Sequence, residues 1–261
     1  LRLMTQTLLI KLGGSVITVK DRALTPNIQA IDGLSHVLAK LGDSFIIVHG
    51  GGSFGHYWSV KYNMHTKAEL YDSRGISMVH ESMVALNQII IKSMLEAGLA
   101  PYGISPTTLF ADGKVNVTKI NELVEYTRRG IVPVIFGDVV HLNEGRFSIV
   151  SGDSLMTSIA TYLLPSRVIF TVNVDGIYED MTNKKLVKVL NFPTNEISIM
   201  DTPIDVTGGM GRKISEAFEI ARLGIDVNIV NGLNAERVFG ILRGLEVEGT
   251  MIPAISPKGR R

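Results

Sequence analysis

Three glycine-rich turns place a lysine or a histidine where a phosphate group could bind. They occupy residues 11–15 (Lys-Leu-Gly-Gly-Ser), 49–56 (His-Gly-Gly-Gly-Ser-Phe-Gly-His) and 207–213 (Thr-Gly-Gly-Met-Gly-Arg-Lys). Glycine lets backbone N–H groups approach an anion closely, and a helix N-terminus adds a favourable dipole. One such turn alone would more often be a plain strand-to-helix connection. Three turns at the carboxyl edge of one sheet indicate an anion site, because open α/β sheets bind ligands there.

Common nucleotide-binding motifs do not account for these turns. The Walker sequence Gly-x-x-x-x-Gly-Lys-Ser/Thr is absent. Residues 50–55 match Gly-x-Gly-x-x-Gly in letters, but the acidic residues Glu69 and Asp72 that follow lie in a polar segment and not at the end of a strand. We therefore discount a dinucleotide fingerprint.

The lysines beside the turns favour phosphoryl transfer. That chemistry needs cations around the moving phosphoryl group and asks for little covalent chemistry from the protein. Lys11 ends an apolar run, where a lysine seldom lies without a partner anion, and Lys213 lies one helical turn after Gly209. Lys20 falls in a polar loop, and the sequence alone predicts a solvated side chain there.

Two other residues have both a structural and a functional interpretation. Asp153 precedes a predicted helix, so an N-cap is as good an interpretation as a catalytic carboxylate. His56 closes the second turn, where it could donate to a substrate phosphate or pack on Tyr57 and Trp58. Cysteine is absent and the other histidines lack metal-ligand spacing, so we predict no structural zinc and no protein-supplied metal site.

Composition narrows the class of partner. The chain has 261 residues, with 26 basic and 25 acidic side chains and a formal net charge of +1. This balance argues against a nucleic acid or an anionic membrane as partner. The most apolar long stretch, residues 84–100, is interrupted by polar and charged residues, so it is not expected to span a bilayer. No secretory signal is visible, and we expect a cytoplasmic protein.

Short apolar runs alternate with longer amphipathic segments, and this alternation must position the turns. The predicted strands are residues 7–11, 45–49, 131–136, 168–172 and 227–230. The predicted helices are residues 27–41, 73–97, 120–129, 155–163 and 211–223. Residues 109–115 and 141–148 are predicted to form hairpins. The pattern predicts the α/β class, a three-layer αβα sandwich with a mainly parallel open central sheet, in a single domain over residues 1–261.

The ordered motifs resemble those of the amino acid kinase superfamily. The matching segments are residues 11–15, 49–52, 152–153, 171–178 and 207–213, and residues 249–252 resemble its closing strand. Within the superfamily, Ser53-Phe54-Gly55-His56 and the run 13–20 resemble the isopentenyl phosphate kinases. Val19 departs from that pattern, in which a polar residue is common.

This resemblance implies ATP as phosphoryl donor, Mg²⁺ as its companion ion and isopentenyl phosphate as acceptor, with direct in-line transfer to give isopentenyl diphosphate. The residues implied to take part in catalysis are Lys11, Lys20, His56, Asp153 and Lys213. Those implied to contact the acceptor phosphate are Gly50, Gly55, His56 and Gly152. Those implied to hold the nucleotide are Lys11, Gly13, Gly14, Ser15, Gly51, Asp175, Gly209 and Lys213.

The resemblance also implies an acceptor lobe over roughly residues 1–165, a nucleotide lobe over roughly 166–261, and a homodimer. Alternatives are a fosfomycin-type phosphonate kinase, a carboxylate kinase for an amino acid, and a nucleotide sensor without turnover. His56 argues against the carboxylate kinase, and the retained lysines argue against the sensor. An apolar wall for an isoprenoid tail is predicted on the helix after the second turn, where an ordinary core stripe fits equally well. Its candidate residues are Ile76, Met78, Val79, Met83 and Leu86.

Overall fold

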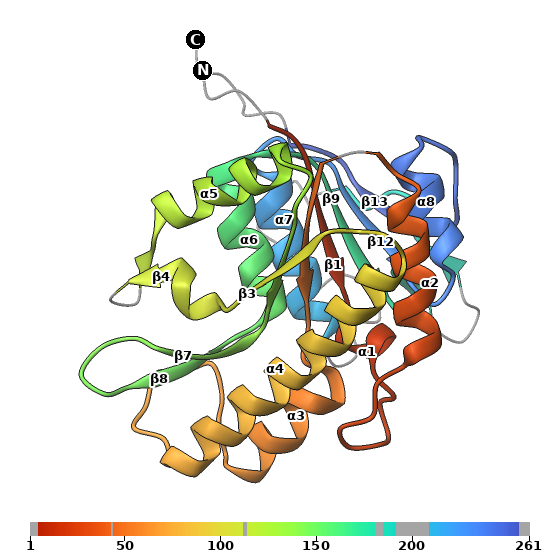
Figure 1. Cartoon of the computed structure of the whole chain (residues 1–261). Helices are drawn as coiled ribbons and strands as arrows, with labels where there is room; N and C mark the ends of the chain where they lie inside the picture. Colours follow the sequence, from red (N-terminus) through yellow and green to blue (C-terminus); the bar gives the residue numbers. More distant parts are fainter. Residues whose placement is uncertain (1–4, 43, 112–113, 181–184, 192–208, 256–261) are drawn as a thin grey trace.

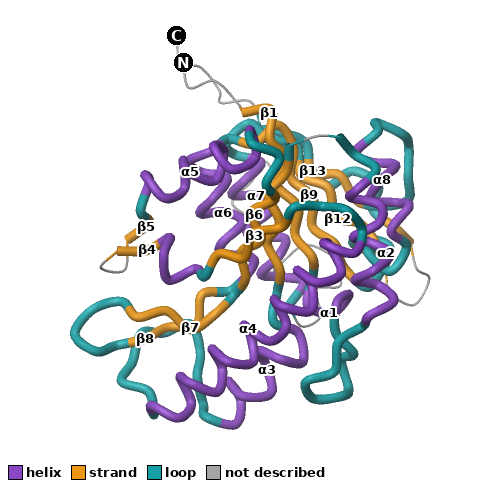
Figure 2. Tube along the Cα trace, viewed as in Figure 1, coloured by secondary structure: helices purple, strands orange, loops and turns teal. Residues whose placement is uncertain are grey.

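A single seven-stranded sheet forms the middle layer of the protein (Figures 1 and 2). The computed structural model describes residues 5–42, 44–111, 114–180, 185–191 and 209–255. The strands of the sheet are β1 (Thr5–Leu12), β2 (Phe45–His49), β3 (Pro101–Ile104), β6 (Val132–Phe136), β9 (Pro165–Val172), β12 (Val227–Asn231) and β13 (Thr250–Ile252). Their spatial order is β13-β12-β9-β1-β2-β6-β3, and all neighbours pair in parallel except β12 and β13. The predicted fold class is confirmed.

Helices cover both faces of the sheet. Those on one face are α5 (Val117–Arg128), α6 (Gly152–Leu163) and α7 (Met210–Ala221), and those on the other are α2 (Ile28–Ala39), α4 (Ser73–Glu96) and α8 (Ala235–Leu242). Two short connections, α1 (Gly14–Ile17) and α3 (Gly52–Lys61), follow the first two strands. Each face has its own apolar core, and both cores combine residues from before and after position 165.

The sequence pattern explains why these helices form where they do. In α6, the N-cap Ser151 accepts a hydrogen bond from the Ser154 amide, and the helix ends at Leu164 in the left-handed conformation. Its apolar residues recur at helical spacing and are all buried against the sheet: Leu155, Met156, Ile159, Ala160 and Leu163. The face therefore packs while the N-terminus of α6 stays at the carboxyl edge of the sheet.

The predicted strands and helices are confirmed, with ends that differ by a few residues. The second hairpin is confirmed with longer arms, β7 (Asp138–His141) and β8 (Phe147–Val150). In the first, β4 (Phe110–Ala111) pairs with β5 (Lys114–Val115), and the turn residues 112–113 lie outside the described part of the chain. A further small pair joins β10 (Tyr178–Asp180) and β11 (Lys185–Leu186).

One expectation about the second glycine turn was wrong. Residues 49–56 are not a continuous loop, because the chain enters helix α3 at Gly52. His56 therefore lies on a helix. Strand β3 and helices α1 and α8 were also not predicted.

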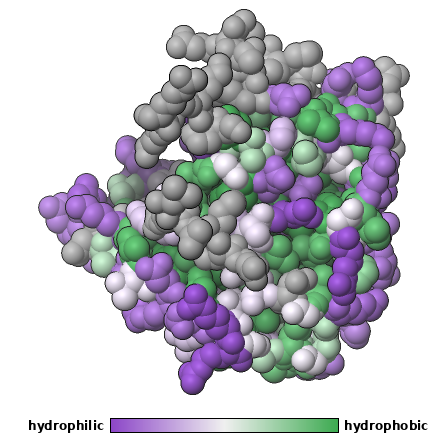
Figure 3. Space-filling model, turned by 90° about the horizontal axis from the view of Figure 1, so that it is seen from above, coloured by the Kyte–Doolittle hydropathy of each residue, from purple (hydrophilic) through white to green (hydrophobic). Residues whose placement is uncertain are grey.

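Figure 3 shows the face from which β1 starts, opposite to the carboxyl edge of the parallel strands. Apolar residues lie mainly in the middle of this face and hydrophilic ones mainly along its sides. Among the described residues, no helix combines the length and the apolarity needed to cross a bilayer.

Candidate active site

The first two glycine turns touch each other at the carboxyl edge of the sheet. A Cβ atom on Gly14 would lie 2.3 Å from the amide nitrogen of Gly52, so the close approach of the turns requires glycine there. Gly13 donates its N–H to the Thr171 hydroxyl (2.9 Å), and Gly50 donates to the Leu12 carbonyl (3.0 Å). Those two amides therefore make hydrogen bonds within the protein and are not free to bind a ligand. The bonds hold the turns against β9 and β1.

Thr18 fastens the start of α3 to the first turn. Its hydroxyl accepts from the Ser53 amide (2.9 Å) and donates to the Gly14 carbonyl (2.7 Å). The amides of Gly14 and Ser15, at the start of α1, have no acceptor among the described residues, as expected in a first helical turn. Gly51 is the N-cap of α3, and Gly55 lies in the following turn.

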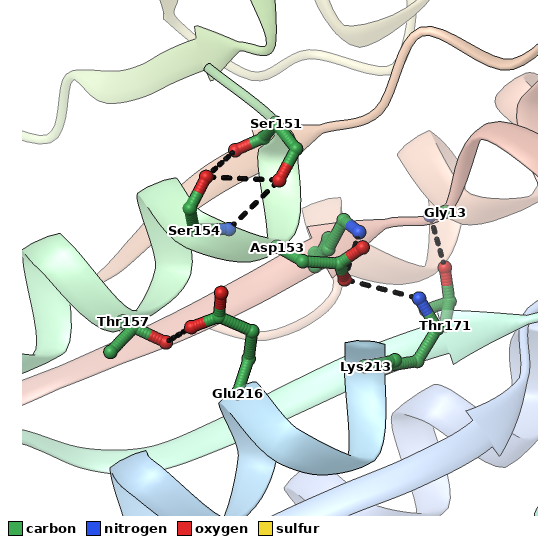
Figure 4. Close-up of polar contacts among 9 residues, drawn as sticks. Gly13, Ser151, Asp153, Ser154, Thr157, Thr171, Lys213 and Glu216 are labelled. Carbon is green, nitrogen blue, oxygen red and sulfur yellow. Dashed lines mark hydrogen bonds and ion pairs between the residues drawn. The ribbon is translucent and has the colours of Figure 1, made fainter. Parts of the chain in front are cut away.

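The centre of the site is a cluster of two lysines and one carboxylate. Lys11 is the penultimate residue of β1, Asp153 lies in the first turn of α6, and Lys213 lies in the first turn of α7. Both ammonium groups donate to the same oxygen, Asp153 Oδ1. The bond from Lys213 measures 3.1 Å (Figure 4). Each ammonium nitrogen also lies 5.8 Å from the centroid of the Phe170 ring, within reach of a cation–π contact. Three elements far apart in the sequence thus meet around one oxygen atom.

Burial makes the charges of this cluster interdependent. Only 5% of the Lys11 side chain, 15% of Asp153 and 12% of Lys213 is exposed. Burial lowers the pKa of Lys11 from 10.5 to about 7, and the charge of Lys213 acts in the same direction while Asp153 opposes it. Burial alone would raise the pKa of Asp153, but the charges of Lys11 and Lys213 outweigh it and hold that pKa below its usual value. An anion placed beside Lys11 would restore its charge.

The interpretation of Asp153 as an N-cap was wrong. Ser151 caps α6, and the Asp153 carboxylate turns to the lysines instead (Figure 4). Gly152, between Ser151 and Asp153, packs closely against the Lys11 side chain. A Cβ on Gly152 would lie 3.1 Å from Lys11 Cε and 3.0 Å from the His49 carbonyl oxygen.

His56 and Lys20 lie outside this cluster. Both side chains are exposed, and neither has a polar side-chain partner among the described residues. The aromatic contact in this segment joins Tyr57 to Trp58 and leaves the His56 ring out. Lys20 lies in the connection between α1 and α2, which Thr25 ties to the Ser53 hydroxyl in α3. The loop of Lys20 is thereby attached to the helix that carries His56.

Asp175 lies on the other side of the site, beyond β9. Its carboxylate accepts from Asn231 (3.1 Å), Tyr178 (2.8 Å) and Arg237. The hydrogen bonds from Asn231, Arg237 and Tyr178 lower the pKa of Asp175 to about 2. Gly209 is the N-cap of α7, while Thr207 and Gly208 of the third turn lie outside the described residues.

The predicted apolar wall is mostly core. Val79, Met83 and Leu86 are buried in the core of the α2–α4 face, and Ile76 and Met78 are half-buried. An open cavity of about 400 Å³ lies elsewhere, between α6, α7 and the β7–β8 hairpin. Its apolar lining is Phe110, Ile149 and Val150, and its polar rim includes Ser151 and Arg212.

Sequence reasoning missed the residues that hold the site together. Thr171 and Thr18 orient the glycine turns, and Asn231 and Arg237 hold Asp175. His49 is fully buried, with Nδ1 3.2 Å from the Gly50 carbonyl oxygen and Nε2 3.2 Å from Asn87 Oδ1, and burial lowers its pKa to about 4. These contacts depend on strand register and helix packing, for which the local sequence carries no signal.

The described residues contain no group of three histidine, aspartate or glutamate side chains that could hold a metal ion. Asp153, the carboxylate of the cluster, is already paired with two lysines. This donor set does not fit a protein-bound Mg²⁺.

A buried cationic cluster between glycine turns, at the carboxyl edge of a parallel sheet, defines a phosphate-binding α/β protein. Comparison with known proteins refines this class. The family model described as "Amino acid kinase family" matches residues 6–231. The chain belongs to the amino acid kinase family.

Similar proteins share most of the chain. An isopentenyl phosphate kinase of Thermoplasma acidophilum is 34% identical over 90% of this chain and 95% of its own length. One of Methanothermobacter thermautotrophicus is 32% identical over 94% of this chain and 98% of its own. A crystal structure of the T. acidophilum enzyme in a product complex matches with a TM-score of 0.78 at 30% identity, over 95% of this chain and 100% of the other.

Proposed function

We propose that this protein transfers the γ-phosphoryl group of ATP to isopentenyl phosphate. An oxygen of the acceptor phosphate forms a bond to the γ-phosphorus while the bond to the ADP oxygen breaks, giving isopentenyl diphosphate and ADP. The observation that carries this proposal is the buried cluster of Lys11, Asp153 and Lys213, in a chain that shares most of its length with isopentenyl phosphate kinases.

The proposed residue roles follow from charge and position. Lys11 and Lys213 neutralise the phosphates between which the phosphoryl group moves, and Asp153 holds both ammonium groups at one point. The acceptor oxygen is already negatively charged, so the reaction needs positioning more than a general base. His56, exposed on α3, donates to the acceptor phosphate, and Lys20 reaches the transferring group from its loop.

The two substrates approach from opposite sides of the cluster in this proposal. Residues before about position 165 contribute Gly50, Gly55 and Gly152 to the acceptor side, and later residues bind the nucleotide. Asp175, whose carboxylate is held by three donors, shapes the segment that meets the nucleotide, together with Gly209. The backbone around Gly13, Gly14, Ser15 and Gly51 faces the transferring phosphates. No residue of this chain is proposed to hold Mg²⁺; the ion would be supplied together with ATP and would neutralise part of the charge of its phosphates.

The 400 Å³ cavity beside Ser151 is the place that we propose for the isoprenoid tail, because Phe110, Ile149 and Val150 offer it apolar contact. ATP is kept at high concentration in the cytoplasm, so we also propose a cytoplasmic location. The outer strand β3 supports a homodimer: Tyr102 on β3 and Leu95 at the adjoining end of α4 are 55% and 57% exposed.

A coupled ADP-release assay tests the reaction. With Mg²⁺ and ATP, isopentenyl phosphate should give rapid turnover, and ³¹P NMR should show a diphosphate product. Acetylglutamate, uridylate and fosfomycin should give much lower kcat/KM values, because their shapes or charges do not match the site. Strong turnover of one of these and none of isopentenyl phosphate would replace the proposed acceptor. ATP binding without turnover of any acceptor would favour a sensor.

A further inference from the structure

A histidine–aspartate pair outside the cationic cluster joins helix α4 to the β7–β8 hairpin. His80 Nδ1 lies 2.6 Å from Asp138 Oδ2. The Asp138 side chain is fully buried, whereas 47% of the His80 side chain is exposed. The second carboxylate oxygen of Asp138 accepts from the Val139 amide (2.7 Å). A buried carboxylate is costly unless it is compensated, so His80 is the partner that keeps Asp138 in place.

Asp138 begins the hairpin next to the residues of the acceptor side. The preceding Gly137 donates its N–H to the His49 carbonyl (3.1 Å), and a Cβ on Gly137 would lie 3.0 Å from the Gly152 amide nitrogen. Asp138 also pairs across the hairpin with Val150, two residues before Gly152. A shift of Asp138 would therefore be transmitted to Gly152 within one or two peptide units.

His80 lies on α4, next to residues that contact the second glycine turn and the start of α3. Met83, one turn further along α4, packs against the glycine segment. Its Sδ would lie 3.0 Å from a Cβ added to Gly51 and 3.3 Å from a Cβ added to Gly55. Ser82 donates to the Phe54 carbonyl in the same segment (3.0 Å). The part of α4 that carries His80 is therefore the part on which the first turns of α3, with His56, rest.

We propose that His80 and Asp138 are a positioning pair for the acceptor phosphate, fixing the distance between the α3–α4 wall and the β7–β8 wall. The proposal rests on the proposed function, because it assigns the pair to the acceptor side of that reaction. Neither residue touches the reacting atoms. The pair acts through Gly152 on the β7–β8 side and through the segment 51–56 on the α3–α4 side. None of these contacts involves Asp175 or Gly209, which are proposed to meet the nucleotide.

Steady-state kinetics of two variants test the pair. His80→Ala and Asp138→Asn should raise the KM for the acceptor about tenfold or more, equivalent to about 1.4 kcal/mol, while the KM for ATP changes less than about twofold. His80→Asn should recover most of the loss, because its amide nitrogen can take the place of Nδ1 and donate to Asp138. The double variant His80→Ala/Asp138→Asn should cost less than the sum of the two single changes, since both remove one interaction.

A matched change on the same helix is the control. Glu96→Gln removes an exposed carboxylate that pairs with Lys92 on α4 and should leave both KM values unchanged. Equal shifts in the KM for acceptor and ATP, no shift at all, or failure of His80→Asn to rescue would overturn the pair's role. The variants are compared on whichever acceptor the unchanged protein phosphorylates, so a wrong acceptor contradicts only the proposed function. Thermal unfolding of each variant identifies losses that come from misfolding.

Discussion

Lys11 is the least exposed of the three side chains in the cluster, and its charge depends most on what lies beside it. A lysine with a pKa near 7 is only partly protonated at neutral pH. Bound phosphate oxygens would stabilise its charged form and raise that pKa, because an opposite charge close by favours ionisation. Binding of an anion and protonation of Lys11 are therefore linked, so that each promotes the other.

This linkage predicts the pH dependence of the reaction. Only charged Lys11 binds phosphate well, so kcat/KM for ATP should fall as the pH rises above about 7, approaching tenfold per unit. The value of kcat, which reports the occupied site, should begin to fall only at a higher pH. Rate profiles between about pH 6 and 9.5 provide the measurement. In Lys11→Arg, whose guanidinium stays charged, the remaining kcat/KM should lose the fall near pH 7. A flat wild-type profile up to pH 9 would contradict the link.

The elements of the site depend on helix starts that carry no bulky side chain. Helix α6 begins at Gly152 against the end of β2, and Lys11 Cε lies 3.1 Å from the position that a Cβ on Gly152 would occupy. The position of this helix terminus and the position of the lysine are consequently set by the same contact.

Gly152→Ala should displace Lys11 and the start of α6 together. The contacts of 3.0–3.1 Å require a shift of a few tenths of an ångström. We therefore expect kcat/KM to fall about tenfold, less than the loss that a misplacement of about 1 Å can cause, and the free energy of unfolding to fall by about 1–3 kcal/mol. Gly33→Ala, in α2, is the matched control, because its nearest neighbour is the Ala235 Cβ at 3.7 Å. That change should stabilise the helix by about 0.5–1 kcal/mol and leave the kinetics alone. Full activity of Gly152→Ala would show that the contact is not limiting.

At this scale the sequence predicts elements with a strong apolar period and misses those without one. The run 45–49 is a buried strand along its full length, and it was predicted to the residue. Strand β3 begins with a proline, contains a glycine and is half exposed, and helix α3 begins with a glycine and lacks a clear apolar face. Neither has the periodicity on which the prediction depends.

The candidate site shows the same limit. Lys11 and Lys213 were predicted from their place beside glycine turns, and the structure brings both to Asp153. Ser151 and Asp153 flank Gly152, and both are residue types that cap helices. Only the folded structure shows that Ser151 is the N-cap and that the Asp153 carboxylate points toward the lysines. The hydrogen bond from Gly13 to Thr171 joins residues 158 positions apart in the sequence. It forms only because β1 pairs with β9 in one particular register, which the local sequence does not indicate.

Strand β3 is an edge strand of the central sheet. Strand β3 pairs with β6 and leaves its other edge open among the described strands, with Tyr102 beside Tyr126 at a ring distance of 5.6 Å. Such an edge is a template for pairing with another chain unless something covers it. The proposed second copy would cover it and bury Leu95 as well.

Light scattering coupled to size exclusion should therefore give the mass of two chains. Leu95→Glu combined with Tyr102→Lys places charges in the proposed interface and should halve that mass. Leu70→Lys changes a side chain that is 78% exposed on a different segment and should leave the mass unchanged. A single-chain mass for the unchanged protein would exclude the dimer.

Both ammonium groups of the cluster bind one carboxylate oxygen, and this arrangement gives the site a resident competitor for incoming anions. Chloride or bicarbonate carries one negative charge, as Asp153 does. We therefore expect neither ion to gain enough free energy of binding to displace the carboxylate from both lysines. A polyphosphate brings several charged oxygens and can satisfy both lysines while the carboxylate retains a share of each. We therefore expect the unliganded protein to discriminate against singly charged anions of any shape, with both lysines paired to Asp153 until a polyphosphate binds.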